Sequence, residues 1–294
     1  MLARRLATTA VFIPILLVTL LTRFPGQLVM AVVIAVCSIW GLSEFFNLAQ
    51  RLGAQPARLW ICFSAALLPL VVQVCHGLDI PYRYAFAWAA AAGFGVLSIH
   101  VYQARIEQTW MTLMASICGP LYVSIPLMLG QILYLSEPGA WILFFVILAT
   151  WLSDTGAYFG GRMLGRHKLC PTISPGKTWE GSISGLLLSL TGILVVWGVQ
   201  SFRGGPDGLG AGFFWTAGSW LDLIRLELLA LMLVAGGTLG DLIESMLKRD
   251  LKVKDSGSGL TGHGGFLDIT DSLLVNLPLM FFYVLLFEPI PLGI

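Results

Sequence analysis

The sequence predicts an all-α fold, a polytopic bundle of about nine transmembrane helices. Apolar residues make up 57% of the 294 positions and charged residues only 11%, whereas soluble domains carry about 25% charged residues. Mean hydropathy is +0.84. The apolar residues gather in segments long enough to cross roughly 30 Å of hydrocarbon as helices. The expected segments are 7–23, 27–49, 59–76, 84–103, 109–135, 139–160, 180–202, 221–248 and 267–287.

The distribution of basic residues predicts the orientation of these segments. With nine crossings and a cytoplasmic N-terminus, 13 of the 17 Lys and Arg residues fall on the cytoplasmic side, and the other four are Arg23, Arg83, Arg203 and Arg225. This asymmetry follows the positive-inside rule. It places two polar loops, 161–179 and 249–266, on the same cytoplasmic face. The first apolar segment lacks a small-x-small cleavage pattern, so we expect a retained helix rather than a signal peptide.

Several features narrow the fold and the class of partner. The formal net charge is +1, so no nucleic-acid partner is expected. The five cysteines are scattered without a C-x-x-C pair, which predicts neither a disulfide framework nor a zinc site. The long segment 109–135 contains Gly119-Pro120 and Pro126, so we expect a kink there.

Charged residues within membrane segments are costly and are candidates for function, and here they cluster in the C-terminal half. Asp154 ends the sixth segment. A second group occupies one face of the eighth segment at spacings i, i+3, i+4 and i+7, and comprises Asp241, Glu244, Ser245 and Lys248. Asp268 and Asp271 share a face at the start of the ninth segment.

Two interpretations of these carboxylates remain open. Glu244 and Lys248 have the spacing of a favourable helical ion pair, so their role can be structural. Asp241, Asp268 and Asp271 have no equal number of nearby intramembrane cations. Mg²⁺ prefers oxygen ligands and binds through one or two carboxylates together with substrate phosphates. We therefore expect a Mg²⁺ site at these three residues, and the presence of a second cation stays open.

The two polar loops carry the opposite charge. Residues 160–181 and 248–265 mix Lys and Arg with Ser, Thr and Gly, a composition that binds phosphates, although basic loops also serve simply as topology signals. His263 stands in Gly-His-Gly-Gly, where glycines let the backbone approach a ligand closely. A helix that begins near Phe266 would add N–H donors at its positive end.

These motifs resemble the signature of the phosphatidate cytidylyltransferases, also called CDP-diacylglycerol synthases. The matching residues run from Ser245 through Lys248-Arg249 to Lys254-Asp255, and then from Gly262-His263-Gly264-Gly265 to Asp268 and Asp271. Three further stretches, 154–162, 174–181 and 240–245, look like the same family. The resemblance covers roughly residues 120–285. It implies N-terminal transmembrane helices over 1–119 and a catalytic transmembrane region with cytoplasmic motif loops over 120–294.

The resemblance implies that CTP and phosphatidic acid react to give CDP-diacylglycerol and pyrophosphate in phospholipid biosynthesis. It implies catalytic roles for Asp241, Lys248, Lys254, Asp255, Asp268 and Asp271. It implies substrate binding by Asp154, Ser174, Lys177, Thr178, Glu180, Ser245, Arg249, His263, Gly264 and Gly265. The expected partners are CTP, phosphatidic acid and membrane lipids, with a homodimer left open. The expected location is a bacterial inner membrane, with the active site facing the cytoplasm.

Two departures from the family pattern keep alternatives open. Thr261 stands where the family usually has Pro, and Ile269 stands where it usually has Arg. Loss of that cation allows a catalytically impaired member, and a different lipid phosphate would be an alternative acceptor. Intramembrane carboxylates also occur in transporters, but no inverted repeat is visible and the charges gather at one membrane face. We therefore expect an enzyme.

Overall fold

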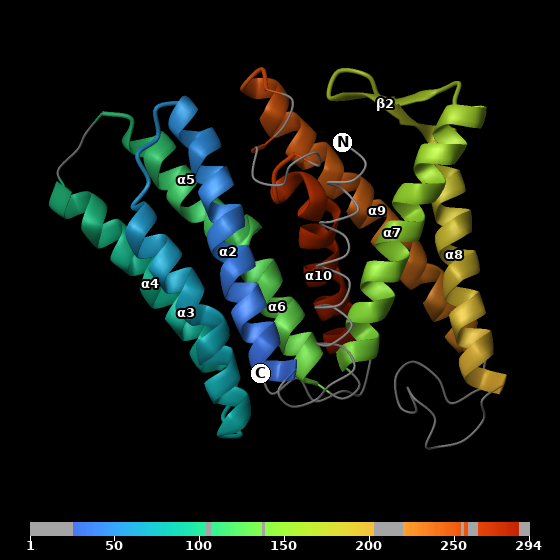
Figure 1. Ribbon diagram of the computed structural model, residues 1–294, viewed down its shortest axis with the longest axis horizontal. Helices are drawn as coiled ribbons and strands as arrows, with labels where there is room; N and C mark the ends of the chain where they lie inside the picture. The colour runs from blue at the N-terminus through green and yellow to red at the C-terminus, as the bar shows by residue number, and fades with distance from the viewer. Residues whose placement is uncertain are drawn as a thin grey trace. The chain divides into compact units, whose positions relative to one another are not determined.

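The computed structural model describes residues 26–103, 107–136, 139–202, 220–253, 256–257 and 264–287. Within these ranges the chain is mainly helical (Figure 1). The helices are α2 (Gly26–Arg51), α3 (Arg58–Gly77), α4 (Arg83–Gln103), α5 (Thr109–Tyr122), α6 (Ser124–Leu135), α7 (Gly139–Leu164), α8 (Trp179–Phe202), α9 (Trp220–Asp250) and α10 (Leu267–Phe287). Two short strands, β1 (Lys168–Cys170) and β2 (Ser174–Thr178), lie between α7 and α8.

The helical membrane architecture is confirmed. Among the described residues, seven spans are long and apolar enough to cross a membrane, with α5 and α6 counted together as one of them. In α8 the described apolar stretch, Trp179–Val195, is shorter than a full span. The predicted first segment, 7–23, lies outside the described residues. The chain is thus an integral membrane protein with an all-α bundle, and the count of nine crossings stays a prediction.

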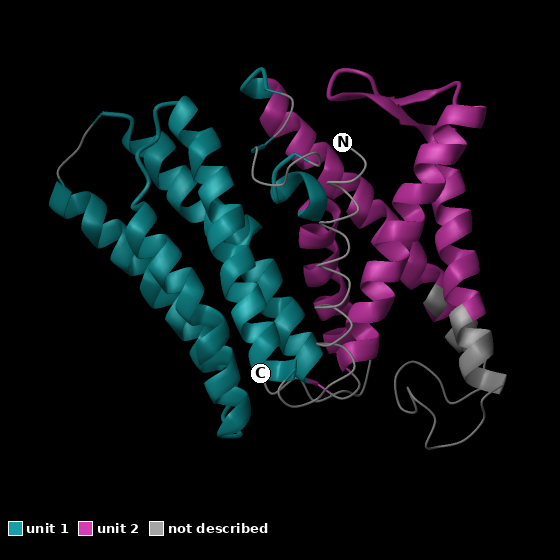
Figure 2. Ribbon diagram, viewed as in Figure 1, with its two compact units in different colours: residues 1–135, 250–270, 291–294 teal, residues 136–249, 271–290 magenta. Residues whose placement is uncertain are grey.

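The chain forms two compact units, coloured separately in Figure 2. The first contains residues 1–135, 250–270 and 291–294, and the second contains residues 136–249 and 271–290. Helix α10 therefore begins in the first unit and continues in the second. The expected division at residue 119 describes the extent of the family resemblance rather than compact units, and it stays a prediction.

In the first unit, α2 packs on α3 and α3 packs on α4, while α5 and α6 contact α2 and α3. The expected kink in segment 109–135 is present, because α5 ends at Tyr122 and α6 begins at Ser124. Val123 between them keeps a hydrogen bond from its N–H to the carbonyl oxygen of Gly119 (2.9 Å). Pro126 has no N–H to donate back into the preceding turn, which explains the interruption of the helix.

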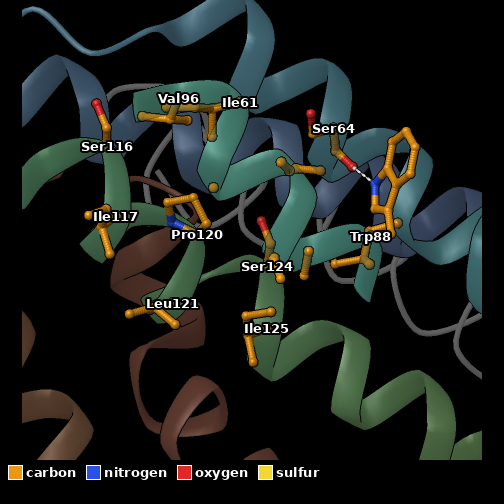
Figure 3. Close-up of a pocket in the computed structure, with 16 residues that line it drawn as sticks. Ile61, Ser64, Trp88, Val96, Ser116, Ile117, Pro120, Leu121, Ser124 and Ile125 are labelled. Carbon is orange, nitrogen blue, oxygen red and sulfur yellow. Dashed lines mark hydrogen bonds between the residues drawn. The ribbon is translucent and has the colours of Figure 1, made fainter. Parts of the chain in front are cut away.

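An apolar cavity of about 270 Å³ lies in the first unit (Figure 3). Its wall is formed mainly by Ala, Leu and Ile side chains of α3 to α6, together with Trp88. The indole Nε1 of Trp88 donates to the carbonyl oxygen of Ser64 (3.1 Å). Among the described residues that line the cavity, none is ionisable. An anionic group would find no counter-charge among these residues.

In the second unit, α7 packs along α8, and β1 pairs with β2 in an antiparallel hairpin between them. We expected residues 161–179 to be a polar loop, whereas α7 extends to Leu164 and a hairpin follows it. Polar bonds join the remaining helices. The Asn276 side chain donates from Nδ2 to Thr150 Oγ1 (2.8 Å), which links α10 to α7. Ser272 Oγ donates to the carbonyl oxygen of Gly237 (3.1 Å), which links α10 to α9.

Candidate active site

The hairpin of the second unit is held by the Glu180 carboxylate at the start of α8. It accepts hydrogen bonds from the backbone N–H groups of Arg166 (3.0 Å) and His167 (3.1 Å). The His167 ring also contacts it, with 2.5 Å between Nδ1 and Oε1. Thr178 Oγ1 accepts from the N–H of Gly181 (3.1 Å), as a capping side chain does. Glu180 and Thr178, expected to bind substrate, therefore shape the hairpin that carries Lys177.

Lys177 projects from β2 to the beginning of the polar face of α9, at Asp241. Its Nζ lies 2.6 Å from Asp241 Oδ2 and donates to the carbonyl oxygen of Thr238 (3.2 Å). The two side chains of this ion pair are 21% and 39% exposed. A partly exposed ion pair is weak, and both of its charged groups are accessible to a ligand. Ligand groups can therefore replace either partner.

Two further carboxyl groups lie close to this ion pair. Asp271, from α10, lies within hydrogen-bond reach of Asp241. Asp154, from α7, lies near enough to Asp241 and Lys177 to interact with both charges. The Asp271 side chain is buried, and its Oδ1 accepts from the N–H of Ser272 (2.7 Å). Adjacent carboxylates repel each other, and a cation between them removes that repulsion. Three helices and the hairpin thus build one cluster around Asp241.

The last two turns of α9 carry the other predicted residues of this unit. Glu244 and Lys248 form an ion pair with little exposure of either side chain, which supports the structural interpretation of their spacing. Arg249 Nε donates to the carbonyl oxygen of Ile173 in the hairpin (3.3 Å). This bond brings the end of α9 to the turn just before Ser174. Ser245 lies one residue after Glu244 on the same helix and is half-buried.

Asp268 and the glycines before it belong to the first unit. Asp268 Oδ2 accepts from the N–H of Gly265 (2.6 Å) and from the N–H and Oγ of Ser256 (both 2.9 Å). Gly264 has a φ of +86°, a conformation that L side chains rarely adopt. The structure therefore gives Asp268 a part in shaping the segment that leads into α10.

Sequence reasoning missed Glu44, a buried glutamate of α2. Its carboxylate accepts four hydrogen bonds, one each from Trp40, Ser256, Phe266 and Leu267. The charged residues predicted to be functional all lie in the C-terminal half, whereas Glu44 lies in α2. The available signal was an acidic residue deep inside an apolar segment that is otherwise free of acidic side chains, which is a functional candidate by default.

The metal set expected at Asp241, Asp268 and Asp271 is divided between the units. Asp241 and Asp271 lie together in the second unit, and Asp268 lies in the first. In the described part of the chain, no three His, Cys, Asp or Glu side chains are grouped so as to hold a metal ion. Lys254, Asp255 and His263 fall outside the described residues. Their roles, like the metal set, stay predictions.

Comparison with known proteins assigns the family. Residues 3–287 match the model of the Cytidylyltransferase family. The chain belongs to this family. The match extends through the N-terminal helices, which the resemblance of the motifs did not cover.

Curated relatives match the chain over part of its length. A phosphatidate cytidylyltransferase of Staphylococcus saprophyticus is 44% identical over 142 residues, which is 48% of either chain. That of Bacillus subtilis is 39% identical over 158 residues, 54% of this chain and 52% of the relative. That of Haemophilus influenzae is 38% identical over 159 residues, 52% and 50% of the two chains. The chain thus aligns with about half the length of the curated relatives it matches.

Proposed function

We propose that this chain is a CTP-dependent phosphatidate cytidylyltransferase. The observation that carries this function is the cluster of Lys177, Asp241 and Asp271 in a member of the Cytidylyltransferase family. The names of the aligned relatives support phosphatidic acid as the acceptor. The cluster combines a cation with two adjacent carboxyl groups, which is the chemistry that a triphosphate and its counter-ion require.

In the proposed reaction a phosphate oxygen of phosphatidic acid attacks the α-phosphorus of CTP. A new P–O bond forms, the bond between the α-phosphorus and the bridging oxygen breaks, and pyrophosphate leaves with that electron pair. The lipid phosphate is anionic near neutral pH because its second pKa is about 6, so it needs no strong general base. The obstacle is the approach of two polyanions, and catalysis is chiefly positioning and charge neutralisation.

The protein groups act on this reaction through charge and position. Lys177 would leave Asp241 and bind a phosphate oxygen, since both partners of the ion pair are partly exposed. Arg249 lies beside the same hairpin and would bind a second phosphate group. Glu180 would hold the hairpin at the geometry that places Lys177 over α9. Lys248 is paired with Glu244. It would therefore contribute positive charge near the site without binding a phosphate directly.

The residues of the second unit fit a Mg²⁺ ion. Asp241 and Asp271 offer two adjacent carboxyl groups, the donor set that Mg²⁺ takes together with substrate phosphates. When bound there, the ion would neutralise charge on the phosphates. Asp268 would remain an organiser of its own segment, where Oδ2 already accepts three hydrogen bonds. A second cation and a homodimer stay open.

The expected topology completes the account of the substrates. A cytoplasmic active site at a bacterial inner membrane would receive CTP from water and phosphatidic acid from the leaflet. Cysteine labelling at native Cys170, in the hairpin, should then proceed from the cytoplasmic side of sealed vesicles. Labelling only from the opposite side would contradict this orientation.

The direct test is turnover by the purified protein in lipid nanodiscs. With CTP, Mg²⁺ and phosphatidic acid, we expect CDP-diacylglycerol and pyrophosphate in equal amounts. An isoprenoid phosphate offered in place of phosphatidic acid should give little product. Preference for that acceptor would change the proposed substrate. No nucleotide transfer to either lipid, from protein that is monodisperse and thermally cooperative, would overturn the proposed function.

A further inference from the structure

Glu44 holds both ends of the motif segment that leads into α10. At one end, Oε2 accepts from Ser256 Oγ (3.2 Å). At the other, Oε1 accepts from the N–H of Phe266 (2.8 Å) and Oε2 from the N–H of Leu267 (3.0 Å). These contacts join residues 212 to 223 positions apart in the chain. One carboxylate of an N-terminal helix thus contacts both Ser256 and the start of α10.

The donors around Glu44 satisfy it completely. Trp40 Nε1 donates to Oε1 (2.9 Å), so each oxygen accepts two hydrogen bonds. An ionised carboxylate can only accept hydrogen bonds, and all four partners of Glu44 are donors. Burying a charge in an apolar bundle is costly unless hydrogen bonds replace its hydration. Two of the donors are N–H groups at the start of α10, which have no partner within the helix.

The surface of α2 around Glu44 also packs closely against the described residues on either side of it, Gly257 and Gly265–Phe266. The Trp40 ring stacks on Phe266, with centroids 5.9 Å apart. A side chain at Gly265 would collide with Glu44 Oε2, and one at Gly257 would lie 2.8 Å from Oε1. These two glycines therefore permit the backbone to approach the carboxylate. A side chain at Gly265 would also collide with Ser256 Oγ, so Glu44 and Ser256 together leave no space for one.

We infer that Glu44 is a positioning residue for the proposed reaction, acting by fixing Ser256 and the backbone of Phe266 and Leu267. The assignment rests on the proposed function, since the predicted substrate-binding residues Gly264 and Gly265 directly precede Phe266. Glu44 touches no reacting group itself. Its carboxylate fixes the backbone directly after Gly265, at Phe266 and Leu267. Loss of the carboxylate would release both ends of the segment at once.

The test compares Glu44→Gln with Ser38→Ala, a buried polar residue of the same helix. Gln keeps the size of the side chain, but it replaces one accepting oxygen by an NH₂ group, which is a donor and would face two other donors. Lys252, exposed in the connection from α9, supplies a trypsin site next to the anchored segment. In nanodiscs we expect Glu44→Gln to be cut after Lys252 about tenfold faster, as loss of two ordinary hydrogen bonds implies. We expect kcat to fall by roughly 10- to 100-fold. Ser38→Ala should change neither.

A second variant keeps the test decisive if Glu44→Gln does not fold. Gly265→Ala should reproduce both effects by pushing apart the Glu44 carboxylate and Ser256 Oγ, whereas Gly93→Ala has open space for its methyl group and should change neither rate. The double variant Glu44→Gln with Gly265→Ala should be little worse than either single change, because both break one contact.

The readouts separate two kinds of failure. If the wild type transfers no nucleotide, the proposed function fails, and the protease rates still decide whether Glu44 holds the segment. If Glu44→Gln and Gly265→Ala keep wild-type cutting rates and kcat, the positioning role is wrong. Slower turnover with unchanged cutting after Lys252 would also overturn it, because Glu44 would then act by another route.

Discussion

Glu44 in the first unit and Asp241 in the second are both carboxylates on apolar helices, but their surroundings differ. Glu44 is 5% exposed and accepts from an indole, a hydroxyl and two backbone N–H groups. The Asp241 side chain is 39% exposed and faces the cation of Lys177 and the carboxyl group of Asp271. The four donors to Glu44 are uncharged groups of the protein itself, so no ligand is expected to replace them. A partly exposed cation and a second carboxyl group are partners that a substrate or a metal ion can replace.

The difference in burial and in partners distinguishes acidic residues that stabilise the fold from acidic residues that take part in the reaction. Burial with a full set of hydrogen bonds indicates a residue that organises backbone. Partial exposure beside other charges indicates a residue whose partners change during function. Glu180 shares one feature with Glu44, because it accepts from the backbone N–H groups of Arg166 and His167, but it is half-buried rather than buried. Asp154 resembles Asp241, whose charge it faces.

The largest effect is expected at Asp241. Asp241→Asn keeps the shape of the side chain and removes a charged oxygen ligand beside Asp271, so CDP-lipid formation should fall by at least about 10²-fold. Thermal unfolding should change little. The matched control is Glu227→Gln, an exposed carboxylate of the same helix. Activity of Asp241→Asn above about a tenth of the wild type would place the chemistry elsewhere.

A smaller loss is expected at Lys177. Lys177→Met removes the cation that faces Asp241 and would bind a CTP phosphate, so kcat/KM for CTP should fall by roughly 10- to 100-fold, as for a lost charge-assisted hydrogen bond. Lys168→Met, exposed on β1 of the same hairpin, is the control. Equal losses in the two variants would mean that the hairpin attracts CTP only by its overall charge.

The smallest effect is expected at Ile269. This side chain is 47% exposed in the first turn of α10, so Ile269→Arg should fold normally. Arg would restore the cation of the family pattern, and we expect a lower Mg²⁺ requirement or a lower KM for phosphatidic acid, within roughly tenfold. Leu267→Arg is the contrasting change, because Leu267 is buried and an unpaired charge there should strongly destabilise the protein.

Two outcomes at Ile269 would revise the account. If Ile269→Arg kills an active enzyme, position 269 packs against lipid or protein and has no electrostatic part in the site. If the wild type is inactive and Ile269→Arg restores turnover, the natural chain is a catalytically impaired family member.

Much of the helical architecture could be predicted from the sequence, because long apolar segments dominate it. The interruption near Val123 followed from Gly119-Pro120 and Pro126, which act locally. The shared face of Asp241 and Lys248 followed from helical spacing alone. The β hairpin did not, because its strands are three and five residues long and contain Pro and Gly rather than an alternating apolar pattern.

The site was predicted less completely than the fold. The acidic residues around Asp241 could be predicted because they lie in apolar segments next to basic loops and match a family motif. Glu44 was missed because all but one of its partners lie more than 200 positions away, and no local spacing reveals such contacts. Glu180 was identified, but its hydrogen bonds to the hairpin depend on a turn that the sequence pattern did not predict.

The central claim is that Asp241 and Asp271 together accept a divalent cation, and binding of Mn²⁺ measures this without turnover. Mn²⁺ shares the preference of Mg²⁺ for carboxylate oxygens and is detected by electron paramagnetic resonance. In nanodiscs of uncharged lipid with CTP present, the wild type and Glu227→Gln should bind Mn²⁺ alike. Asp241→Asn and Asp271→Asn should each weaken binding by at least about tenfold. Unchanged Mn²⁺ binding in both variants would contradict the claim.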